Sequence, residues 1–462
     1  MDYQLQAVER EVFRAYDIRG IISEQFGDHA FYTLGRAIAT QLYSLGRQSI
    51  FLARDGRLTS EQLAAALKAG LMASGAHVID LGAVATPVMY YAVHNGDIDS
   101  GVMVTGSHNP ADYNGIKMVL AGKTLVQTDI ELLYDIVSKA EFYSACGHEE
   151  KQEILVDYQQ RVVRDIKLQR PLKVVVDCGN GIAGNVIPQV IASLGCEVVP
   201  LFCEVDGNFP NHHPDPTVEE NLIDLRAAVL AHKADIGLAF DGDADRLGVL
   251  TEEGEIIWPD RLMMFYARHI LQRLPKSTIV FDVKCSANLA QVIEDAGGVA
   301  MMCPTGHSIV KAVMKETQAV LAGEMSGHLF FKDGWYGFDD ALFSACRLLE
   351  MVSKSPLSVS GQFAAIPNSV NTPEIKIPIS DAKKFSFMQQ FLQQADFPDA
   401  DIVRIDGMRV EFEHGWGLLR ASNTTPCLIA RFEAQNLESL EDIKQRFRVQ
   451  LWRIDKEMLL PF

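Results

Sequence analysis

Apolar runs that end in a carboxylate recur three times in the first three-quarters of the chain. Strands are predicted at residues 49–55, 173–177 and 278–282, and each closes on an aspartate. A stretch of helical periodicity follows each strand, at residues 60–72, 182–194 and 287–296. A glycine and a second apolar run come next, from Gly75, Gly195 and Gly297. Strand, helix and strand at this spacing indicate parallel sheets covered by helices.

A third apolar run in each repeat leads into a polar loop. Residues 101–104 precede a loop with Ser107, residues 235–240 precede a run of aspartates from Asp241, and residues 319–322 precede a loop with Glu324. Ligands of open α/β sheets bind beyond the carboxyl ends of the strands. We therefore expect these three loops to face one shared cleft.

The last hundred residues have a different pattern. Beyond the Ser- and Pro-containing stretch 353–360, strands are predicted at residues 374–378, 407–412, 417–421 and 427–434, with helices at 381–394 and 437–454. The predicted fold is α/β: three related α/β domains with mixed or parallel sheets, plus a smaller C-terminal α+β domain, around a central cleft. The expected domains are residues 1–150, 151–253, 254–365 and 366–462.

Ser107 lies in the run Thr105-Gly-Ser-His-Asn-Pro110, directly after a predicted strand. A serine needs activation to act as a nucleophile, and the adjacent His108 is a candidate base. Taken alone, a serine in such a loop more often serves as a turn or cap residue. Lys117, shortly downstream, either brings a positive charge to the same site or is a surface lysine.

Asp241, Asp243 and Asp245 alternate within five residues and Arg246 follows at once. In an extended or looped segment such positions can point to one side, where unpaired carboxylates would repel one another. A bound divalent cation resolves that repulsion, and an all-carboxylate donor set favours Mg²⁺ over zinc. The alternative is a solvated acidic turn. Together with the Ser107 hydroxyl, the cluster points to phosphoryl transfer.

Two further loops carry residues suited to a phosphorylated sugar. In the third repeat Glu324, Ser326 and His328 alternate, and these groups can donate to and accept from vicinal hydroxyls; the alternative is a polar loop between domains. His307, after the second strand of that repeat, is a further candidate. Near the C-terminus, Arg420 precedes a run of small hydroxyl and amide residues whose backbone N–H groups suit phosphate: Ser422, Asn423 and Thr424.

The composition of the chain argues against several classes of binding partner and site. The 462-residue chain has a formal net charge of −18, which argues against a nucleic-acid or anionic-membrane surface. Its eight cysteines are scattered singly, without a CxxC pair, so neither a zinc site nor a disulfide framework is indicated. No signal peptide and no apolar run of membrane-spanning length is apparent. A cytoplasmic protein is expected.

The chain resembles the α-D-phosphohexomutase superfamily, most closely its bacterial phosphomannomutase/phosphoglucomutase branch. The Ser107 loop is similar to that family's phosphoserine loop, and residues 241–246 to its metal loop. Residues 323–328 resemble its sugar loop, and residues 420–425 its phosphate loop. All four occur in the family's order and span nearly the whole chain. The family architecture agrees with the repeat.

The resemblance implies a reversible mutase that interconverts hexose 1-phosphate and hexose 6-phosphate through a phosphoserine and a bisphosphorylated intermediate. Ser107 would carry the phosphoryl group, beside one Mg²⁺ held by Ser107 and the three aspartates. A hexose 1,6-bisphosphate would serve as activator. The remaining catalytic positions would be His108, Lys117 and Arg246.

Substrate-binding positions also follow from the resemblance. They would be Tyr16, Arg19, Lys284, His307, Glu324, Ser326, His328, Arg420, Ser422, Asn423 and Thr424. From the residues alone, Arg19 either reaches the cleft or pairs with Asp17. The expected partner is a small phosphosugar, with no nucleic acid and no membrane, and the expected state is a monomer or weak homodimer.

Three alternatives remain at this level. A phosphoglucosamine mutase would use the same chemistry on another sugar. A non-catalytic phosphosugar-binding protein would be expected to lack Ser107 or one of the aspartates, and all are present. A Mg²⁺-dependent phosphatase would use water as acceptor and would not need the sugar and phosphate loops.

Overall fold

A computed structural model describes residues 3–423 and 425–462 of the chain. It divides into two compact units. The first comprises the residues up to Pro259 together with Ser326–Ala365, and the second comprises Asp260–Met325 together with Ile366–Phe462. In the described part of the chain, no helix combines the length and the apolar character that a bilayer crossing requires.

The first unit begins with a mixed sheet of order β1-β5-β4-β2-β3-β7, with β6 paired to β5. The strands are β1 (Ile18–Ile21), β2 (Ser49–Arg54), β3 (His77–Ala83), β4 (Gly101–Val104), β5 (Tyr113–Leu120), β6 (Lys123–Thr124) and β7 (His148–Lys151). The helical segments are η1 (Arg10–Val12), α1 (Asp28–Ser44), α2 (Ser60–Ala73), α3 (Thr86–Asn95) and α4 (Gln127–Lys139). Strands β4, β2, β3 and β7 are parallel neighbours, whereas β5 is antiparallel to β4 and β1.

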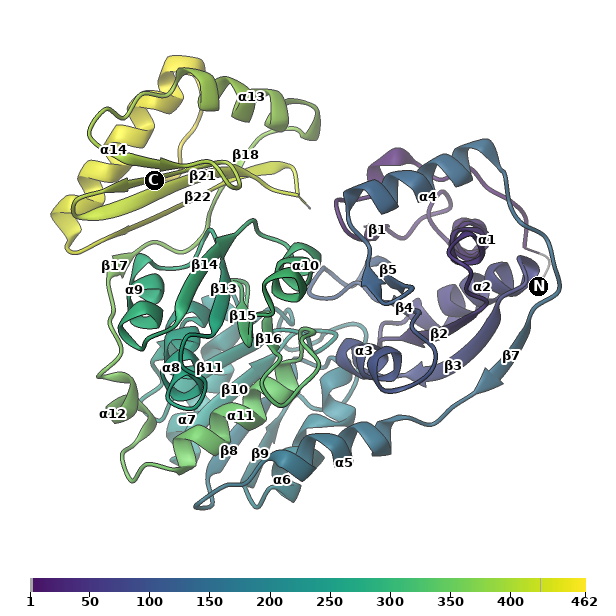
Figure 1. Ribbon diagram of the computed structural model, residues 1–462, viewed down its shortest axis with the longest axis horizontal. Coiled ribbons are helices and arrows are strands. Elements are labelled where there is room, and N and C mark those ends of the chain that lie inside the picture. Colours follow the sequence, from purple (N-terminus) through teal and green to yellow (C-terminus); the bar gives the residue numbers. More distant parts are fainter. Residues whose placement is uncertain (1–2, 424) are drawn as a thin grey trace. The chain divides into compact units, whose positions relative to one another are not determined.

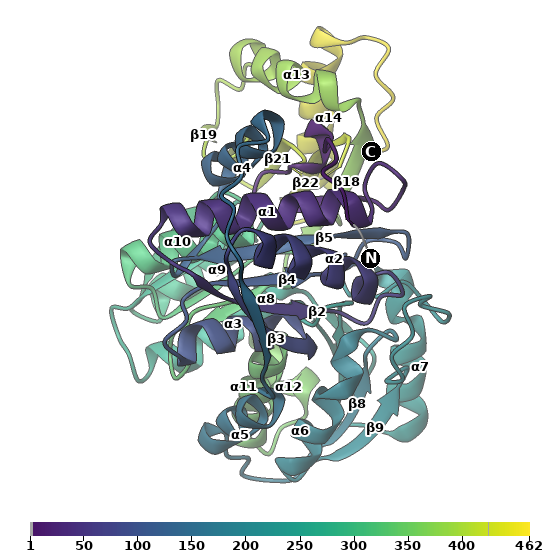
Figure 2. The same cartoon turned by 90° about the vertical axis from the view of Figure 1, so that its right-hand side faces the viewer.

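Helices cover both faces of this sheet. Helices α1, α2 and α4 lie on one face and α3 on the other (Figure 1), and α1 runs alongside α2 (Figure 2). The central strands are therefore continuous apolar runs, and Ile50, Val78 and Val102 are fully buried in the core beneath α1 and α2. Because the strand interiors are apolar, polar chemistry is confined to the strand ends.

The first unit also contains a second mixed sheet, with the strand order β12-β11-β10-β8-β9. Its strands are β8 (Lys173–Asp177), β9 (Glu197–Leu201), β10 (Ile236–Phe240), β11 (Leu247–Thr251) and β12 (Ile256–Ile257). The helices are α5 (Leu155–Asp165), η2 (Ile182–Asn185), α6 (Ile187–Ser193), η3 (Glu219–Leu222) and α7 (Ile223–His232). Strand β16 (Leu329–Phe331) and helices α11 (Ala341–Ser353) and α12 (Val359–Phe363) also belong to this unit.

The helix predicted over residues 182–194 is wrong in its first part. The segment forms the 3₁₀ turn η2 and then the shorter helix α6, with Val186 between them. Pro188 stands in the first turn of α6, where its missing N–H is tolerated and its ring starts a new helix. Gly184 lies so close to the next loop that a Cβ would meet the Cys203 carbonyl oxygen at 1.9 Å. That packing fixes the 3₁₀ turn in place.

The second unit contains a parallel sheet in which β13 (Thr278–Asp282) lies between β14 (Val299–Cys303) and β15 (Leu321–Gly323). Helix α8 (Pro259–Leu271) begins at the unit boundary, and α9 (Ala287–Asp295) and α10 (His307–Thr317) follow β13 and β14. The third repeat of strand, helix and strand is thus confirmed.

An antiparallel sheet of order β17-β22-β21-β20-β19, with β18 also paired to β22, forms the C-terminal region. Its strands are β17 (Val370–Asn371), β18 (Ile375–Pro378), β19 (Asp401–Val403), β20 (Met408–Phe412), β21 (Gly415–Ala421) and β22 (Cys427–Ala434). Helices α13 (Asp381–Gln394) and α14 (Leu437–Ile454) cover one face of it (Figure 1). Phe391, Phe432 and Phe447 are buried between helices and sheet.

Candidate active site

The Ser107 loop is built on the carboxylate at the end of β2. Asp55 accepts a hydrogen bond from Thr105 Oγ1 at 2.7 Å and one from the Gly106 N–H at 3.3 Å. Thr105 Oγ1 in turn accepts a 2.8 Å hydrogen bond from the Ser107 N–H. Because β2 and β4 are parallel neighbours, their carboxyl ends meet at one edge of the sheet. Asp55 therefore fixes the backbone that presents Ser107.

A buried arginine closes the same loop from the other side. Arg57 donates to the carbonyl oxygens of Ser107, Asn109 and Pro110 at 2.7, 2.6 and 2.6 Å. Its Nε lies 3.3 Å from Asp55, and both side chains of the pair are 1% exposed. A guanidinium offers several donors in one plane, and three carbonyls of one loop match that geometry. Ser107 itself has φ of 49°, a left-handed conformation that this support sustains.

The Ser107 hydroxyl meets the aspartate loop between β10 and β11. Its Oγ lies 3.1 Å from Asp241 Oδ2 and 3.1 Å from His108 Nδ1. The two loops also touch through their backbones, since a Cβ on Gly242 would stand 2.4 Å from the Ser107 carbonyl oxygen. The candidate nucleophile and the candidate metal loop, far apart in sequence, are therefore in direct contact.

Three buried carboxylates form the centre of this region. One ligand atom from each of Asp241, Asp243 and Asp245 lies within 4.8 Å of the others. Lys117, on β5, forms ion pairs with Asp243, at 2.7 Å, and with Asp245. Thr86, at the start of α3, donates to Asp243 Oδ2 at 2.5 Å. The cluster is thus shared between both sheets of the first unit.

Charge and burial shift the protonation equilibria of these groups. Burial raises the pKa of Asp241 well above its usual value, and the charges of Asp245 and Asp243 raise it further. Burial alone would lower the pKa of Lys117, but the surrounding carboxylates outweigh it and raise that pKa. Burial would likewise raise the pKa of Asp243, but its ion pair with Lys117 lowers it instead.

The donor set fits a hard divalent cation. Asp243 Oδ1 and Asp245 Oδ1 are buried and accept no hydrogen bond from any described residue. A buried carboxylate oxygen without a donor is costly unless a cation compensates it. Oxygen ligands are the ones that Mg²⁺ and Ca²⁺ prefer. The acidic cluster therefore indicates a divalent metal next to Ser107.

His328 and Arg246 stand beside the cluster. Arg246 Nε donates to His328 Nε2 at 3.1 Å, and the two residues form an isolated β-bridge. His328 Nδ1 lies 3.2 Å from Asp339 and 3.5 Å from Asp245. Ser326, two residues before His328, is half-buried. Sequence position alone places His328 with the third repeat, but the structure places it in the first unit against the metal loop.

Cations near Ser107 act on His108. Desolvation lowers the pKa of His108 well below its usual value, and the charges of Arg246 and Arg19 lower it further. The imidazole is therefore neutral near pH 7 and can accept a proton. Arg19 pairs with Asp17 and also donates to Asn109 Oδ1 at 2.7 Å. From the sequence, Arg19 either reaches the cleft or pairs with Asp17. The ion pair with Asp17 is present, and the same side chain also reaches the Ser107 loop. Tyr16 is half-buried.

In the second unit, Asp282 at the end of β13 organises the sugar-loop candidates. It accepts from the Met325 N–H at 3.1 Å and from Thr305 Oγ1 at 3.0 Å. Lys284 Nζ lies 3.6 Å from Asp282 and 2.6 Å from Glu374. Burial would lower the pKa of Lys284, but these carboxylates raise it, so the amine is held charged.

Glu324 and His307 meet at the start of α10. Glu324 Oε1 accepts from the Gly306 N–H at 2.7 Å, and both Glu324 and His307 are buried. Asp406 links this region to β21, since it accepts from the Thr305 N–H at 3.0 Å and from Arg420 Nε at 2.9 Å. Lys284 and Arg420 are thereby connected through Asp282, Thr305 and Asp406, and Glu324 binds the neighbouring N–H that precedes His307.

The loop after Arg420 is partly described. Ser422 is buried and its hydroxyl lies 2.7 Å from Thr425 Oγ1, while Asn423 is half-buried. Thr424 lies outside the described residues. The Thr425 N–H donates to Ser422 Oγ at 3.1 Å, so this serine shapes the turn of the loop.

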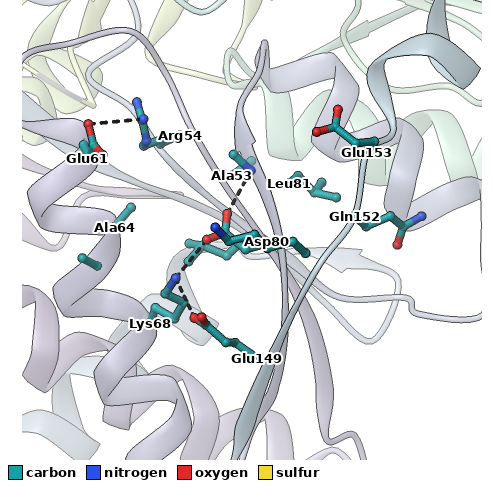
Figure 3. A pocket seen from close by; sticks show the side chains of 14 residues that line it. Ala53, Arg54, Glu61, Ala64, Lys68, Asp80, Leu81, Glu149, Gln152 and Glu153 are labelled. Carbon is teal, nitrogen blue, oxygen red and sulfur yellow. Dashed lines mark hydrogen bonds and ion pairs between the residues drawn. The ribbon is translucent and has the colours of Figure 1, made fainter.

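A separate pocket of ≈ 380 Å³ opens where β2, β3 and β7 end, next to α2 (Figure 3). Lys68 lies 3.0 Å from Asp80 and 2.7 Å from Glu149, and Arg54 lies 3.5 Å from Glu61. Figure 3 shows these ion pairs within the pocket wall. The lining residues include none of the sequence-predicted site residues. Its paired charges make it a poor match for a phosphate.

Several residues of this site had no role in the sequence prediction. Asp55 and Asp282 could have been singled out, because each is the last residue of a predicted strand. In the sequence they served only to mark where those strands end. Arg57, Thr86 and Asp339 reach the site through contacts across elements. Such contacts depend on how strands are ordered in the sheet, which local patterning does not reveal.

Family models match the chain in four consecutive segments. They are described as phosphoglucomutase/phosphomannomutase alpha/beta/alpha domain I over residues 10–144, domain II over 156–254, domain III over 258–369, and the C-terminal domain over 374–450. The chain thus has the four-domain architecture expected from its sequence.

Individual proteins match over nearly the full length. A phosphomannomutase/phosphoglucomutase of Pseudomonas putida is 52% identical over 99% of this chain and 98% of its own. A phosphoglucomutase of Neisseria gonorrhoeae is 47% identical over 96% of this chain and 97% of its own. A solved phosphoglucomutase/phosphomannomutase family structure from Burkholderia thailandensis is 45% identical, with a TM-score of 0.94, and covers 98% of this chain and 100% of that chain.

Proposed function

The chain belongs to the phosphoglucomutase/phosphomannomutase family, and we propose that it interconverts mannose or glucose 1-phosphate and the corresponding 6-phosphates by way of Ser107. The contact of Ser107 Oγ with Asp241, 3.1 Å long, carries the residue-level proposal. It joins a hydroxyl that can hold a phosphoryl group to a cluster of carboxylates suited to a cation.

In the proposed reaction, phosphorylated Ser107 donates its phosphoryl group to the free O1 or O6 of the sugar phosphate. The P–O bond to Ser107 breaks as the P–O bond to the sugar forms, and the proton of the attacking sugar hydroxyl passes to Ser107 Oγ, which gives a hexose 1,6-bisphosphate. The intermediate then returns its other phosphoryl group to Ser107, and the sugar oxygen released in this step takes up, by way of His108, the proton that Ser107 Oγ loses. His108, neutral near pH 7 and 3.1 Å from Ser107 Oγ, takes the hydroxyl proton in that return step. The same bisphosphate, added as activator, would load unphosphorylated Ser107.

One Mg²⁺, held by Asp241, Asp243, Asp245 and Ser107, would supply positive charge where the phosphoryl oxygens develop negative charge. Lys117, on β5 of the first sheet, and Arg246, directly before β11 of the second, add cationic charge of their own beside the cluster. Lys117 also holds Asp243 ionised and forms an ion pair with Asp245. Phosphoryl transfer depends mainly on positioning and charge neutralisation, which these residues supply.

The substrate would be bound by the remaining candidates. Arg420, Ser422, Asn423 and Thr424 would hold the phosphate that does not react, and Glu324, Ser326 and His328 the sugar hydroxyls. Tyr16, Arg19, Lys284 and His307 would add further contacts. In support, Lys284 is kept charged by Glu374 and Asp282, and Arg420 is fixed in place by Asp406.

We also propose domain boundaries, a cellular location and an oligomeric state. The domains would meet near residues 150, 253 and 365. The protein would act in the cytoplasm as a monomer or weak homodimer, which sedimentation of the purified chain tests. Its net charge of −18 disfavours nucleic acid as a partner.

Phosphorus NMR tests the activity. The purified protein with Mg²⁺ is given mannose, glucose or glucosamine 1-phosphate, each with a trace of its 1,6-bisphosphate. We expect 6-phosphates from mannose or glucose 1-phosphate. Faster turnover of the glucosamine compound would favour a phosphoglucosamine mutase, and inorganic phosphate alone would favour a phosphatase. No change from folded, metal-loaded protein would favour a binding protein.

Two variants make the test specific for Ser107. Ser107→Ala should lower turnover by on the order of 10⁴-fold or more, because no other group can carry the phosphoryl group. Ser138→Ala, in an exposed position on α4, is the matched control and should behave as wild type. Wild-type turnover by Ser107→Ala would refute the proposed mechanism.

A further inference from the structure

Two thiols outside the proposed active site lie in contact. Cys178 directly follows β8, and Cys203 comes two residues after the end of β9. Their Sγ atoms are 3.4 Å apart. Cys178 is buried, whereas Cys203 is partly exposed. The pair belongs to the second sheet of the first unit and has no part in the reaction proposed above.

The backbone holds these two cysteines together. The Cys178 N–H donates to the Leu201 carbonyl at 3.1 Å, and the Asn180 N–H donates to the Phe202 carbonyl at 2.8 Å. Asn180 Nδ2 also donates to the Glu204 carbonyl at 2.8 Å. Asn180 and Phe202 both adopt left-handed conformations, with φ of 59° and 47°. The approach of the thiols thus follows from two loops bonded to each other at the ends of parallel strands.

We propose that Cys178 and Cys203 form a reversible disulfide when a hydroperoxide oxidises Cys203. In the first step the Cys203 sulfur attacks the peroxide O–O bond, which yields a sulfenic acid and one molecule of water or alcohol. In the second step the Cys178 sulfur attacks the Cys203 sulfur, the S–O bond breaks, and water leaves with the Cys178 proton. Overall, the two thiols lose two electrons and one peroxide gains them.

The surroundings assign the two roles. The contact with the Cys178 thiol lowers the pKa of Cys203, although burial opposes this. Burial raises the pKa of Cys178 well above its usual value, so this thiol suits the second step and not the first. Cys196 provides a contrast, because burial raises its pKa to about 11. Partial exposure and a supported thiolate make Cys203 the group that meets the oxidant.

The disulfide would act on the metal loop. A disulfide needs a sulfur separation of about 2.05 Å, so the two sulfur atoms must approach each other by more than 1 Å from the present contact. The loop after Cys178 supports the metal loop: the Ile182 N–H donates to the Gly242 carbonyl at 3.1 Å. A Cβ on Gly181 would stand 2.8 Å from the same carbonyl oxygen, so little slack separates the two segments. A movement of the Cys178 loop on disulfide formation would therefore be passed on to Gly242, which itself packs on Ser107.

We expect oxidation to lower mutase turnover by roughly 10- to 100-fold, the usual effect of a displacement near 1 Å in a positioning element. The test treats the full-length, Mg²⁺-loaded protein with hydrogen peroxide and counts free thiols after unfolding. The count should fall from eight to six, with one non-reduced peptide joining Cys178 to Cys203. Dithiothreitol should restore both the thiols and the turnover.

Matched variants make the result specific. Cys203→Ser and, independently, Cys178→Ser should retain basal turnover and lose the reversible response to peroxide. Cys146→Ser, which removes an exposed thiol elsewhere in the first unit, should respond as wild type. The two variants of the pair remove different partners, so a folding defect in one leaves the other informative.

Two results would overturn the inference. A count that stays at eight, or Cys203 found as a stable sulfenic or sulfonic acid without a bond to Cys178, refutes the disulfide. Full turnover by protein that is completely cross-linked refutes its effect on the metal loop. Thiol counts and peptide maps do not depend on mutase activity, so neither result is confused with a failure of the proposed function.

Discussion

Single buried side chains set the geometry of the Ser107 loop. Arg57 binds three carbonyl oxygens of the loop and pairs with Asp55, which binds the loop from the other side. Removing one member of such a pair leaves an uncompensated buried charge and several unpaired carbonyls. The position of the candidate nucleophile therefore depends on residues that do not touch the sugar.

Arg57→Lys tests this dependence while keeping the charge. An ammonium cannot reproduce the planar fork that reaches three carbonyls, so we expect kcat to fall by roughly 100-fold through misplacement of Ser107. Arg54→Lys is the control, because Arg54 is partly exposed and pairs only weakly with Glu61 at 3.5 Å. Its kcat should stay within about twofold of wild type. Equal effects of the two substitutions would contradict the assigned role of Arg57.

His212 provides a prediction of pH dependence. Its Nε2 lies 3.0 Å from Asp177 Oδ2, and the imidazole is 13% exposed. Burial would lower the pKa of His212, but the hydrogen bond and charge of Asp177 raise it above its usual value. The folded state thus binds this proton more tightly than the unfolded state. The stabilisation is fully present below about pH 6.5 and is lost as pH rises through the higher folded-state pKa.

His212→Gln should reveal that pH dependence in the melting temperature. The Tm difference between wild type and variant should be larger near about pH 6 than near about pH 9. The exposed His232→Gln variant serves as a control for general effects of pH. If the Tm difference instead grew with rising pH, the folded state would disfavour protonated His212, which would contradict the prediction.

Strand ends are the elements on which the sites are built. Asp55, Asp177 and Asp282 each close the first strand of a repeat, and each side chain hydrogen-bonds the loop that begins there or next to it. The sequence pattern was sufficient to predict these strands and the polar loops that follow, because apolar runs and loop residues are local properties.

Other parts of the site could not be predicted locally. Lys117 lies opposite Met103 of β4 in the first sheet, yet it pairs with Asp243 and Asp245, which lie in the loop between β10 and β11 of the second sheet. The helix predicted at residues 182–194 was wrong over its first part because Gly184 packs against the Cys203 backbone and the α-helix begins only at Ile187, next to Pro188. Strand order and loop packing are non-local, so periodicity in one segment carries no signal of them.

Gly242→Ala tests the contact between the two loops. The added Cβ would stand 2.4 Å from the Ser107 carbonyl oxygen, so one loop must move. We expect about 1–3 kcal/mol of destabilisation from overpacking and a kcat lowered by roughly 100-fold. Gly96→Ala is the control, because its nearest contact would be an ordinary 3.6 Å. A fully active Gly242→Ala enzyme would show that the loops need not touch.

For the molecule as a whole, the three buried carboxylates are a concentrated source of instability. Asp241, Asp243 and Asp245 repel one another, and Lys117 compensates only part of the charge. A cation that binds the folded state and not the unfolded chain stabilises the fold by mass action. Metal binding should therefore be visible in the stability of the protein, independently of catalysis.

Thermal unfolding with Mg²⁺ and with a chelator measures that linkage. At a hundredfold excess of Mg²⁺ over its Kd, stabilisation of about 2.7 kcal/mol is expected, and Tm should rise accordingly. Asp243→Asn should abolish most of the rise, whereas Asp97→Asn, at an exposed position, should retain it. Identical melting curves of wild type with Mg²⁺ and with chelator would count against the metal site.

The central claim is that Ser107 carries a phosphoryl group between the two positions of the sugar. The most direct measurement is the mass of the intact protein after incubation with Mg²⁺ and glucose 1,6-bisphosphate, followed by peptide mapping. We expect the gain of one phosphoryl group, located on Ser107, and its loss when excess glucose 1-phosphate is added. No gain in mass, or an equal gain by Ser107→Ala, would contradict it.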